Sequence, residues 1–371
     1  MALCKAEETL DEAIGGFDFG GQIVGTVRYG KGHINDTFCV YTQHENGECV
    51  RYILQRINTD TFQDPDGLME NIAGVTDYLR EMIEKNGGDP ARETLTVKRT
   101  REGKAYYRDT QGGCWRVYPF IENTICLQTV ERPEQFYESA KTFGRFQMLL
   151  ASYDASSLHE TIAHFHDTRS RFQNFQKALE ADACGRAKEV QKEIEFVCSR
   201  EKDCSVLMDL LEEGKLPLRV THNDTKLNNI LIDKATGKGI CIIDLDTVMP
   251  GLSLNDYGDS IRFGANHCAE DEKDLSKVNF DLELFDIYTK GFMEAAGSAL
   301  TPVEKEYLPW GAKLMTLECG IRFLTDYLEG DHYFKVHREG HNLDRCRTQF
   351  KLVQDMENQW EAMQKVVDRY R

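Results

Sequence analysis

The stretch that decides the fold of this chain is Thr221-His222-Asn223-Asp224-Thr225-Lys226-Leu227-Asn228-Asn229-Ile230-Leu231-Ile232. Asp224 follows His222 by two positions, and Asn229 follows Asp224 by five. A second acidic element, Ile242-Ile243-Asp244-Leu245-Asp246, places Asp244 fifteen positions after Asn229, at the end of an apolar run. Two carboxylates and one amide therefore stand at fixed spacings beside short apolar segments.

These spacings suit phosphoryl transfer, which depends on positioning and charge neutralisation more than on covalent chemistry. A hydroxyl nucleophile needs a carboxylate that orients it and accepts its proton, and Asp224 is our candidate for this catalytic role. Mg²⁺ prefers hard oxygen ligands, which Asn229 and Asp244 can supply. Kinase-like folds use this spacing for a catalytic Asp and two magnesium ligands, so we expect ATP and Mg²⁺ as cofactors.

The local pattern around these residues predicts a hairpin. Residues 230–232 are apolar and predict a short strand, and residues 234–239 carry the glycines of a turn. Residues 240–243 predict the returning strand, with Asp244 at its end. Such a hairpin would bring Asn229 and Asp244 to the same edge, where one metal ion could bind both.

These polar residues also admit other interpretations. Clusters of Asp and Asn usually mark turns and caps, but the strand–loop–strand context favours catalysis here. Asp246 is either a second metal ligand or an ordinary loop carboxylate. His222 is expected to brace the loop through hydrogen bonds, and Asp256 to anchor it. The pair His164 and His166 lacks a third ligand nearby and predicts a structural or cleft-lining role.

The pattern His222-x-Asp224-x-x-x-x-Asn229 followed by Ile243-Asp244 resembles the signature of the aminoglycoside phosphotransferase and choline kinase superfamily. Longer strings, from about residue 20 to about residue 355, resemble the N-acetylhexosamine 1-kinase family within it. The resemblance implies an α+β, protein-kinase-like fold of two lobes. It also implies ATP-dependent phosphorylation of the anomeric hydroxyl of GlcNAc or GalNAc. The strings are Gly30–Asn35, Trp115–Tyr118, Glu160–Asp167, Asp244–Gly251 and Arg322–Asp331.

The same resemblance implies that His33, Arg322 and Tyr333 bind the sugar together with Asp224. An Arg offers a fixed fork of donors for several oxygens, and a Tyr offers a hydroxyl and an apolar face. Without the resemblance, Arg322 would be interpreted as part of a surface ion pair and Tyr333 as an aromatic residue of the core. The choice between GlcNAc and GalNAc stays open. One alternative is a kinase of the same fold for homoserine, an amino alcohol or an aminoglycoside. The other is a non-enzymatic nucleotide-binding or scaffolding protein.

The order of predicted elements agrees with two lobes. A β-rich lobe over residues 1–120 is expected to bind the nucleotide, and a mostly helical lobe over residues 121–371 to carry the catalytic loop, the metal and the sugar. Apolar residues at helical spacing predict a helix over 66–85. Strands are predicted within 23–27, 37–42, 50–55 and 94–119.

Nucleotide contacts are expected from the first lobe. Gly30 and Gly32, between two predicted strands, would let backbone amides approach phosphates. Tyr118, Phe120 and Ile121 are expected at the hinge, where backbone groups meet the adenine edge; the neighbouring Pro119 has no N–H to donate.

One departure concerns the third strand, where protein kinases place a phosphate-gripping Lys. Gln55 stands at that position. Arg56 is adjacent but should point to the other face of the strand. Glu70 is the candidate for the acidic partner of this missing cation, and what replaces the Lys is left open.

Composition narrows the classes of partner. A net charge of −17 over 371 residues argues against nucleic acid and against an anionic membrane surface. No apolar run is long enough to span a bilayer, and residues 1–8 lack the apolar core of a signal peptide. The twelve cysteines form no Cys-x-x-Cys pair and suit free thiols in a cytoplasmic protein. The oligomeric state is left open.

Overall fold

The computed structural model describes residues 5–30 and 34–371. Two residues expected in the site, Gly32 at the nucleotide and His33 at the sugar, lie outside the described residues.

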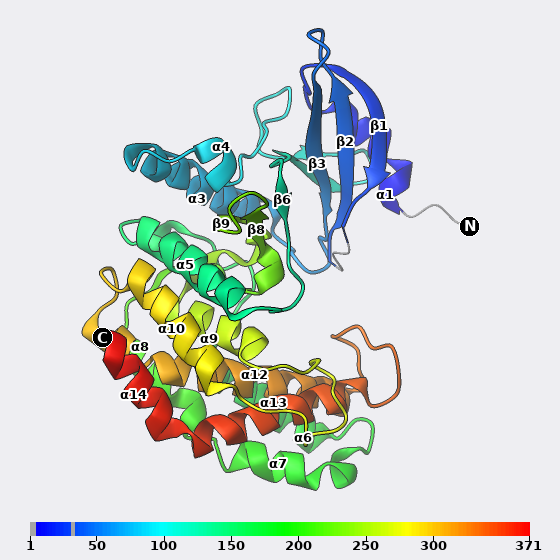
Figure 1. Cartoon of the computed structure of the whole chain (residues 1–371). Helices are drawn as coiled ribbons and strands as arrows, with labels where there is room; N and C mark the ends of the chain where they lie inside the picture. The colour runs from blue at the N-terminus through cyan, green and yellow to red at the C-terminus, as the bar shows by residue number, and fades with distance from the viewer. Residues whose placement is uncertain (1–4, 31–33) are drawn as a thin grey trace.

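The molecule has two lobes, an antiparallel sheet above and a mostly helical body below (Figure 1). The upper sheet has five strands in the order β1-β2-β3-β5-β4, and the lower lobe carries two small sheets, β10-β7 and β6-β8-β9. The expected α+β arrangement of two lobes is therefore confirmed. The strands are β1 (Gln22–Arg28), β2 (Asp36–Gln43), β3 (Cys49–Ile57), β4 (Tyr107–Arg108), β5 (Cys114–Pro119), β6 (Thr124–Ile125), β7 (Arg219–Thr221), β8 (Ile230–Asp233), β9 (Gly239–Ile242) and β10 (Met249–Gly251).

Alternation of side chains fixes the register of the upper sheet. Phe38, Val40 and Leu54 lie on one face and form a small core with Trp115. The turn between β2 and β3 contains Gly47 at φ +84°, a conformation that favours glycine. The strands within 94–119 are shorter than predicted, because only β4 and β5 in that segment are regular; α4 (Pro90–Glu93) lies just before it.

Helix α3 (Pro65–Lys85) joins the two lobes. The Asp64 side chain caps its start by accepting a hydrogen bond from the Gly67 N–H at 3.0 Å. Its apolar stripe, including Leu68 and Leu79, packs in one core with α5 and the β8–β9 hairpin. The helix therefore stands where the sheet meets the catalytic elements.

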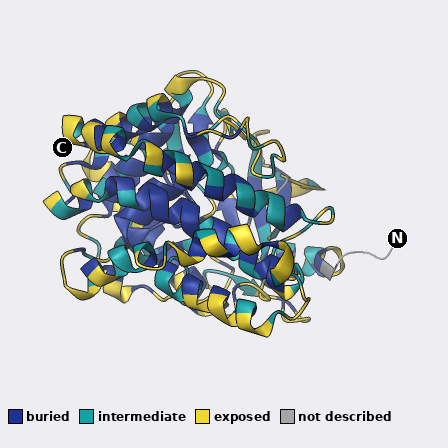
Figure 2. Ribbon diagram, turned by 90° about the horizontal axis from the view of Figure 1, so that it is seen from below, coloured by how far each residue is buried: buried dark blue, intermediate teal, exposed yellow. Residues whose placement is uncertain are grey.

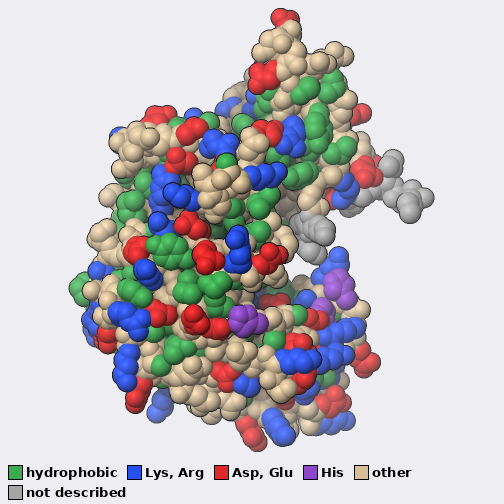
Figure 3. Space-filling model, in the orientation of Figure 1, with side chains coloured by type: hydrophobic (Ala, Val, Ile, Leu, Met, Phe, Trp, Pro, Cys, Tyr) green, Lys and Arg blue, Asp and Glu red, His purple; other side chains and the backbone are tan. Residues whose placement is uncertain are grey.

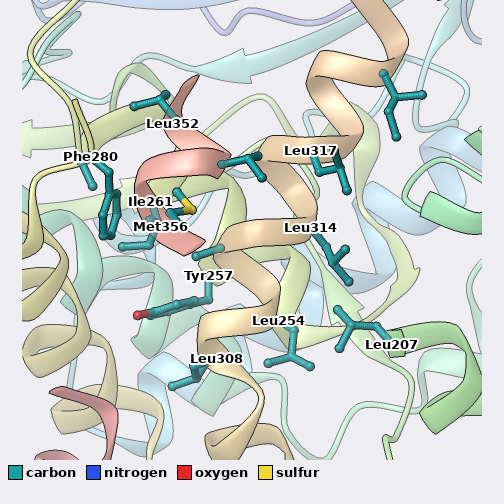
Figure 4. Close-up of a cluster of buried hydrophobic side chains, with 14 of the residues drawn as sticks. Leu207, Leu254, Tyr257, Ile261, Phe280, Leu308, Leu314, Leu317, Leu352 and Met356 are labelled. Carbon is teal, nitrogen blue, oxygen red and sulfur yellow. The ribbon is translucent and has the colours of Figure 1, made fainter. Parts of the chain in front are cut away.

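The lower lobe is organised around the long helix α12. Figure 4 shows Leu314 and Leu317 of α12 among side chains such as Tyr257 and Met356, and Figure 2 shows the buried residues concentrated inside the molecule. No helix in the described ranges is long and apolar enough to cross a membrane. The remaining helices and α12 are α1 (Lys5–Glu8), α2 (Leu10–Gly15), α5 (Pro133–Leu149), α6 (Thr168–Ala181), α7 (Gln191–Cys198), α8 (Val206–Glu212), α9 (Ser253–Gly264), α10 (Leu282–Ala296), α11 (Pro302–Glu306), α12 (Leu308–Glu329), α13 (His341–Asn358) and α14 (Trp360–Tyr370).

Candidate active site

The loop between β7 and β8 is held by a buried carboxylate on α9. The Asp256 side chain accepts hydrogen bonds from the backbone N–H groups of His222 at 3.0 Å and Asn223 at 2.7 Å, and from Gln147 Nε2 at 2.6 Å. Asn223 takes a left-handed conformation at φ +64°, which turns the chain sharply just before Asp224. Asp256 thus anchors the loop, as the sequence predicted.

His222 braces the same loop against the strand that precedes Asp244. Its Nδ1 accepts a hydrogen bond from the Asp224 N–H at 3.2 Å, and its Nε2 donates to the Ile243 carbonyl at 2.9 Å. The ring is buried, so these two bonds fix its orientation. His222 has the bracing contacts expected of it.

Asp224 is surrounded by groups that stabilise its charge. Lys226 Nζ lies 2.7 Å from Asp224 Oδ1, and Asn229 Nδ2 donates to Oδ2 at 3.1 Å. Burial by itself would raise the pKa of Asp224, but the Lys226 ammonium and His222 outweigh it and the pKa is lowered. With its side chain 30% exposed, the carboxylate is both ionised and accessible to a hydroxyl group.

The expected hairpin brings Asn229 and Asp244 together. The Ile243 N–H donates to the Asn229 carbonyl at 2.9 Å, so the residues before β8 and after β9 lie side by side. Asp244 has a left-handed backbone at φ +62° and an exposed carboxylate. Within residues 5–30 and 34–371, no hydrogen bond or ion pair engages that carboxylate.

The surroundings of Asp244 suit a cation. Crowding by protein atoms raises its pKa to about 6, helped by the negative charges of Asp246 and Asp224 and opposed by Arg116 and His222. A carboxylate with acidic neighbours and no donor is satisfied by a metal ion.

The oxygen donors present fit magnesium. Asn229 uses its Nδ2 on Asp224, and no described residue donates to its Oδ1. The structure, over the residues it describes, gathers no three His, Cys, Asp or Glu side chains that could hold a metal by themselves. Mg²⁺ commonly binds through one or two protein oxygens and completes its shell with phosphate oxygens and water. Asn229 and Asp244 fit that pattern.

Arg322 and Tyr333, two of the residues expected at the sugar, lie together on the lower lobe. Arg322 Nη2 donates to the Tyr333 hydroxyl at 3.3 Å, and the Arg322 guanidinium lies 5.3 Å from the ring centre of Phe165. Tyr333 is 65% exposed. The Asp326 carboxylate holds its loop by accepting backbone N–H groups, that of Tyr333 at 2.7 Å.

A histidine connects this cluster to the loop that carries Asp224. His166, next to Phe165, places Nε2 2.9 Å from the Asn223 carbonyl and Nδ1 2.8 Å from Glu318 Oε1. Both ring nitrogens face acceptors, which fixes the ring between α12 and the loop. Figure 3 shows the surface hollowed between the lobes, with histidine and basic side chains on the lower rim.

The hinge expected at Tyr118, Phe120 and Ile121 stays a prediction, and one of its backbone donors is already engaged within the protein. The Phe120 N–H donates to the Arg51 carbonyl at 3.0 Å, so it is already used and cannot also serve an adenine edge. The Phe120 ring is covered by the Arg51 guanidinium, 3.8 Å from its centre. Tyr118 is buried on β5, and no described residue accepts a hydrogen bond from the Ile121 N–H.

The glycine-rich segment begins above this hinge. Tyr29 packs edge-on against the Phe120 ring, with 5.7 Å between the ring centres. Gly30 follows at φ +77°, which turns the chain after β1. Gly30 therefore stands on the hinge side of the upper sheet.

Comparison with known proteins agrees with this geometry. Residues 26–283 match the family described as "Phosphotransferase enzyme family" (APH). The chain belongs to this family.

Solved structures extend the likeness to nearly the whole phosphotransferase. An aminoglycoside phosphotransferase from Alicyclobacillus acidocaldarius is 13% identical with a TM-score of 0.61, covering 97% of this chain and 96% of the other. An amicoumacin kinase in complex with AMP-PNP, Ca²⁺ and Ami is 11% identical with a TM-score of 0.60, covering 96% and 94%. A microcompartment-associated aminopropanol kinase is 15% identical with a TM-score of 0.57, covering 96% and 98%. At these identities the likeness confirms the protein-kinase-like fold.

Two basic residues of the phosphotransferase, Lys226 and Arg116, were not identified from the sequence. Lys226 stands two positions after Asp224, and that proximity is a signal that could have found it. Arg116 lies on β5 and forms a buried ion pair with Asp246, which no local pattern predicts. Asp246 is therefore engaged by protein, and Glu70 instead contacts His159 Nε2 at 2.7 Å.

Proposed function

We propose that this phosphotransferase is an ATP- and Mg²⁺-dependent kinase that phosphorylates the anomeric hydroxyl of an N-acetylhexosamine, giving the sugar 1-phosphate. The observation that supports the proposal is the Asp224 carboxylate, which is ionised and accessible. Asp224 is near enough to raise the pKa of Asp244, whose carboxylate has no donor among the described residues. The cluster of Arg322 and Tyr333 is connected to the Asp224 loop through His166, which contacts the Asn223 carbonyl at 2.9 Å.

The proposed step needs little more than positioning. The sugar O1 attacks the terminal phosphorus of ATP, the bond from that phosphorus to the bridging oxygen of ADP breaks, and the hydroxyl proton passes to Asp224. The lowered pKa of Asp224 keeps it ionised before the step. Lys226, 2.7 Å away, holds the carboxylate in place. Mg²⁺, bound through Asn229 and Asp244, would neutralise the phosphate charge.

The acceptor side supports a neutral ligand. Arg322 presents a planar fork of donors that suits hydroxyl and acetamide oxygens, and Tyr333 presents a ring face for a sugar. Burial and the nearby Arg322 charge lower the pKa of Arg171, so two guanidinium groups lie within electrostatic reach. A cationic acceptor would be repelled by this pair.

The test is an assay of ADP release with a panel of acceptors: GlcNAc, GalNAc, homoserine, choline, ethanolamine and an aminoglycoside. We expect release with the free N-acetylhexosamines and none with their methyl glycosides, in which O1 is blocked. Phosphorus NMR should show coupling of the product phosphorus to the anomeric proton. Turnover of a methyl glycoside, or a product without that coupling, would refute phosphorylation at O1.

The competing candidate is a kinase of the same family for another small hydroxyl acceptor. It is favoured by the solved structures of similar fold, which include an aminopropanol kinase and a choline kinase. Release of ADP with an amino alcohol or an aminoglycoside, and not with the sugars, would establish it in place of the sugar kinase.

A further inference from the structure

A buried ion pair joins the two lobes directly behind the candidate metal site. The Arg116 guanidinium, on β5, contacts Asp246 Oδ1, and the two side chains are 1% and 5% exposed. Asp246 lies two residues after Asp244, in the short η5 helix (Leu245–Thr247). The pair therefore fixes the segment that carries Asp244 to the upper sheet.

Gln55, at the position where protein kinases have their strand lysine, orients the guanidinium of Arg116. Gln55 on β3 is the cross-strand neighbour of Arg116. Its Oε1 accepts a hydrogen bond from Arg116 Nε at 3.1 Å, while its Nε2 donates to Thr37 Oγ1 at 3.1 Å. The Gln55 amide, which carries no charge, therefore orients the positively charged guanidinium of Arg116 towards Asp246.

A second contact from the upper lobe reaches the same carboxylate. Asn35 Nδ2 donates to Asp246 Oδ2 at 2.5 Å, and Asn35 Oδ1 accepts the Asn58 N–H at 2.9 Å. Both oxygens of Asp246 are thereby used by residues of the upper lobe. Because both oxygens of Asp246 are already in contact with protein groups, the carboxylate available to a cation is that of Asp244.

We propose that Arg116 is a positioning residue for the magnesium nucleotide: through Asp246 it holds the Asp244 segment against the upper sheet. It thereby contributes to nucleotide binding without the direct phosphate contact that the strand lysine of protein kinases makes. The inference rests on the proposed function only in taking a magnesium nucleotide as the ligand. Arg116 could contact a phosphate directly or act through Asp246, and its burial decides between these two. A guanidinium 1% exposed cannot grip a phosphate directly, so it acts through Asp246 and Asp244.

The proposal predicts that Arg116 governs the metal-dependent part of nucleotide affinity. The quantity to measure is the ratio between the Kd of fluorescent ADP in EDTA and its Kd in saturating Mg²⁺, by titration without acceptor. Removing Arg116 alone would leave Asp246 buried without its partner and could unfold the protein. The informative variant is therefore the double replacement Arg116→Met with Asp246→Leu, which fills the space with apolar groups.

In the double variant we expect the ratio to fall by about 10-fold or more, the size of a lost charge-assisted interaction. The Kd in EDTA should stay within about twofold, because the metal-free nucleotide does not use Asp244. Arg116→Lys, which keeps the charge but loses the fork that contacts both Gln55 and Asp246, should give an intermediate ratio.

The matched control is Lys313→Met, which removes another buried cation, paired within the lower lobe with Asp203 at 2.7 Å and Glu357 at 2.9 Å. It should lower the melting temperature and leave the ratio unchanged. An unchanged ratio in folded Arg116 variants would overturn the proposal, and an equal loss of affinity with and without Mg²⁺ would overturn it in favour of direct phosphate contact. Failure of the wild-type protein to bind ADP under either condition would instead refute the kinase function itself.

Discussion

Asp224 owes its charge to its neighbours. The surrounding protein disfavours an ionised carboxylate, yet Lys226 at 2.7 Å and the donors around it lower the pKa of Asp224. The same neighbours restrict the orientation of the side chain, since Asn229 Nδ2 contacts the other carboxylate oxygen. In the proposed role of a base, a carboxylate that is already ionised and already oriented would lose little free energy of reorganisation when a substrate arrives.

Replacing Asp224 by Asn should therefore lower kcat by about 10²- to 10⁴-fold, because the amide cannot accept the hydroxyl proton. The Kd of MgADP, measured by titration, should change little, since the carboxylate is not a predicted phosphate contact. Asp154→Asn is the control: this exposed Asp caps a short helical turn by accepting the Ser156 N–H, and an Asn can do the same. Near-normal kcat for Asp224→Asn would contradict the catalytic role.

At the scale of single elements, the sequence predicted a helix or hairpin correctly where the residues that form it are close together in the chain. The β8–β9 hairpin was predicted because its turn glycines and its apolar runs lie within residues 230–243. Helix α3 was predicted because its apolar stripe lies within one segment. Arg116 was missed because its partner, Asp246, is far along the chain and meets it only when the sheet docks on the lower lobe.

The hinge residue Phe120 shows a second limit of sequence reasoning. Its place after β5 was predicted, but the engagement of its N–H with the Arg51 carbonyl depends on the register between β3 and β5. Register of this kind is set by packing of both strands and not by either sequence alone.

Strand β7, which leads into the catalytic loop, is tied to α11 by a buried ion pair. Glu304 is 1% exposed, with Oε1 2.5 Å from Arg219 Nε. Burial by itself would raise the pKa of Glu304, but hydrogen bonds from Arg219, Thr301 and Ser253 lower it below the ordinary value of 4.5. Because the folded-state pKa is the lower one, this stabilisation is present above about pH 4.5 and is lost as the pH falls through the folded value.

Glu304→Gln should reduce the free energy of unfolding at pH 7 by about 3 kcal/mol, because it breaks a buried ion pair. It should also make the decline of stability between about pH 5 and pH 3 shallower than in the wild type. Urea denaturation at a series of pH values measures both effects. Equal slopes for the two proteins would show that Glu304 does not contribute to the acid sensitivity.

The crossing of α9 and α12 depends on the absence of a side chain. A Cβ at Gly258 would lie 2.2 Å from the backbone oxygen of Gly311, which cannot swing aside as a side chain could. Gly258→Ala should therefore destabilise the protein by about 3 kcal/mol. It should also lower kcat, because α9 carries Asp256, the anchor of the catalytic loop.

Thermal denaturation and turnover measure these two effects of Gly258→Ala. Gly15→Ala in α2 is the matched control, since a Cβ there meets no atom within 4 Å. It should leave both quantities close to wild type. Loss of stability of the same size in both variants would mean that helix glycines in general, and not this crossing, are responsible.

At the scale of the whole molecule, the division into lobes at residue 120 stays a prediction. The hydrophobic cores are grouped differently from that division. Helix α3 belongs by sequence to residues 1–120, but Leu68 and Leu79 share a core with Phe146 of α5 and Ile242 of β9. The upper sheet has a separate small core around Phe38 and Trp115. Figure 1 shows α3 beside the helical body, at the foot of the sheet.

Amide hydrogen exchange should report this division of the cores. We expect the amides of α3 to exchange as slowly as those of α5 and the β8–β9 hairpin, and the edge strand β1 to exchange faster. Mass spectrometry of peptides from the three regions measures the rates. If α3 and β1 opened together at one rate, with α5 remaining protected, the cores would not be divided in this way.

The position of α3 also determines what an isolated half of the molecule would be. A fragment ending at residue 120 would carry a helix of 21 residues whose apolar stripe has lost the surface that covers it. The complementary fragment would expose the matching apolar side chains of α5 and β9. We therefore expect that neither half folds by itself, and that the enzyme unfolds cooperatively as one body and resists separation into working modules.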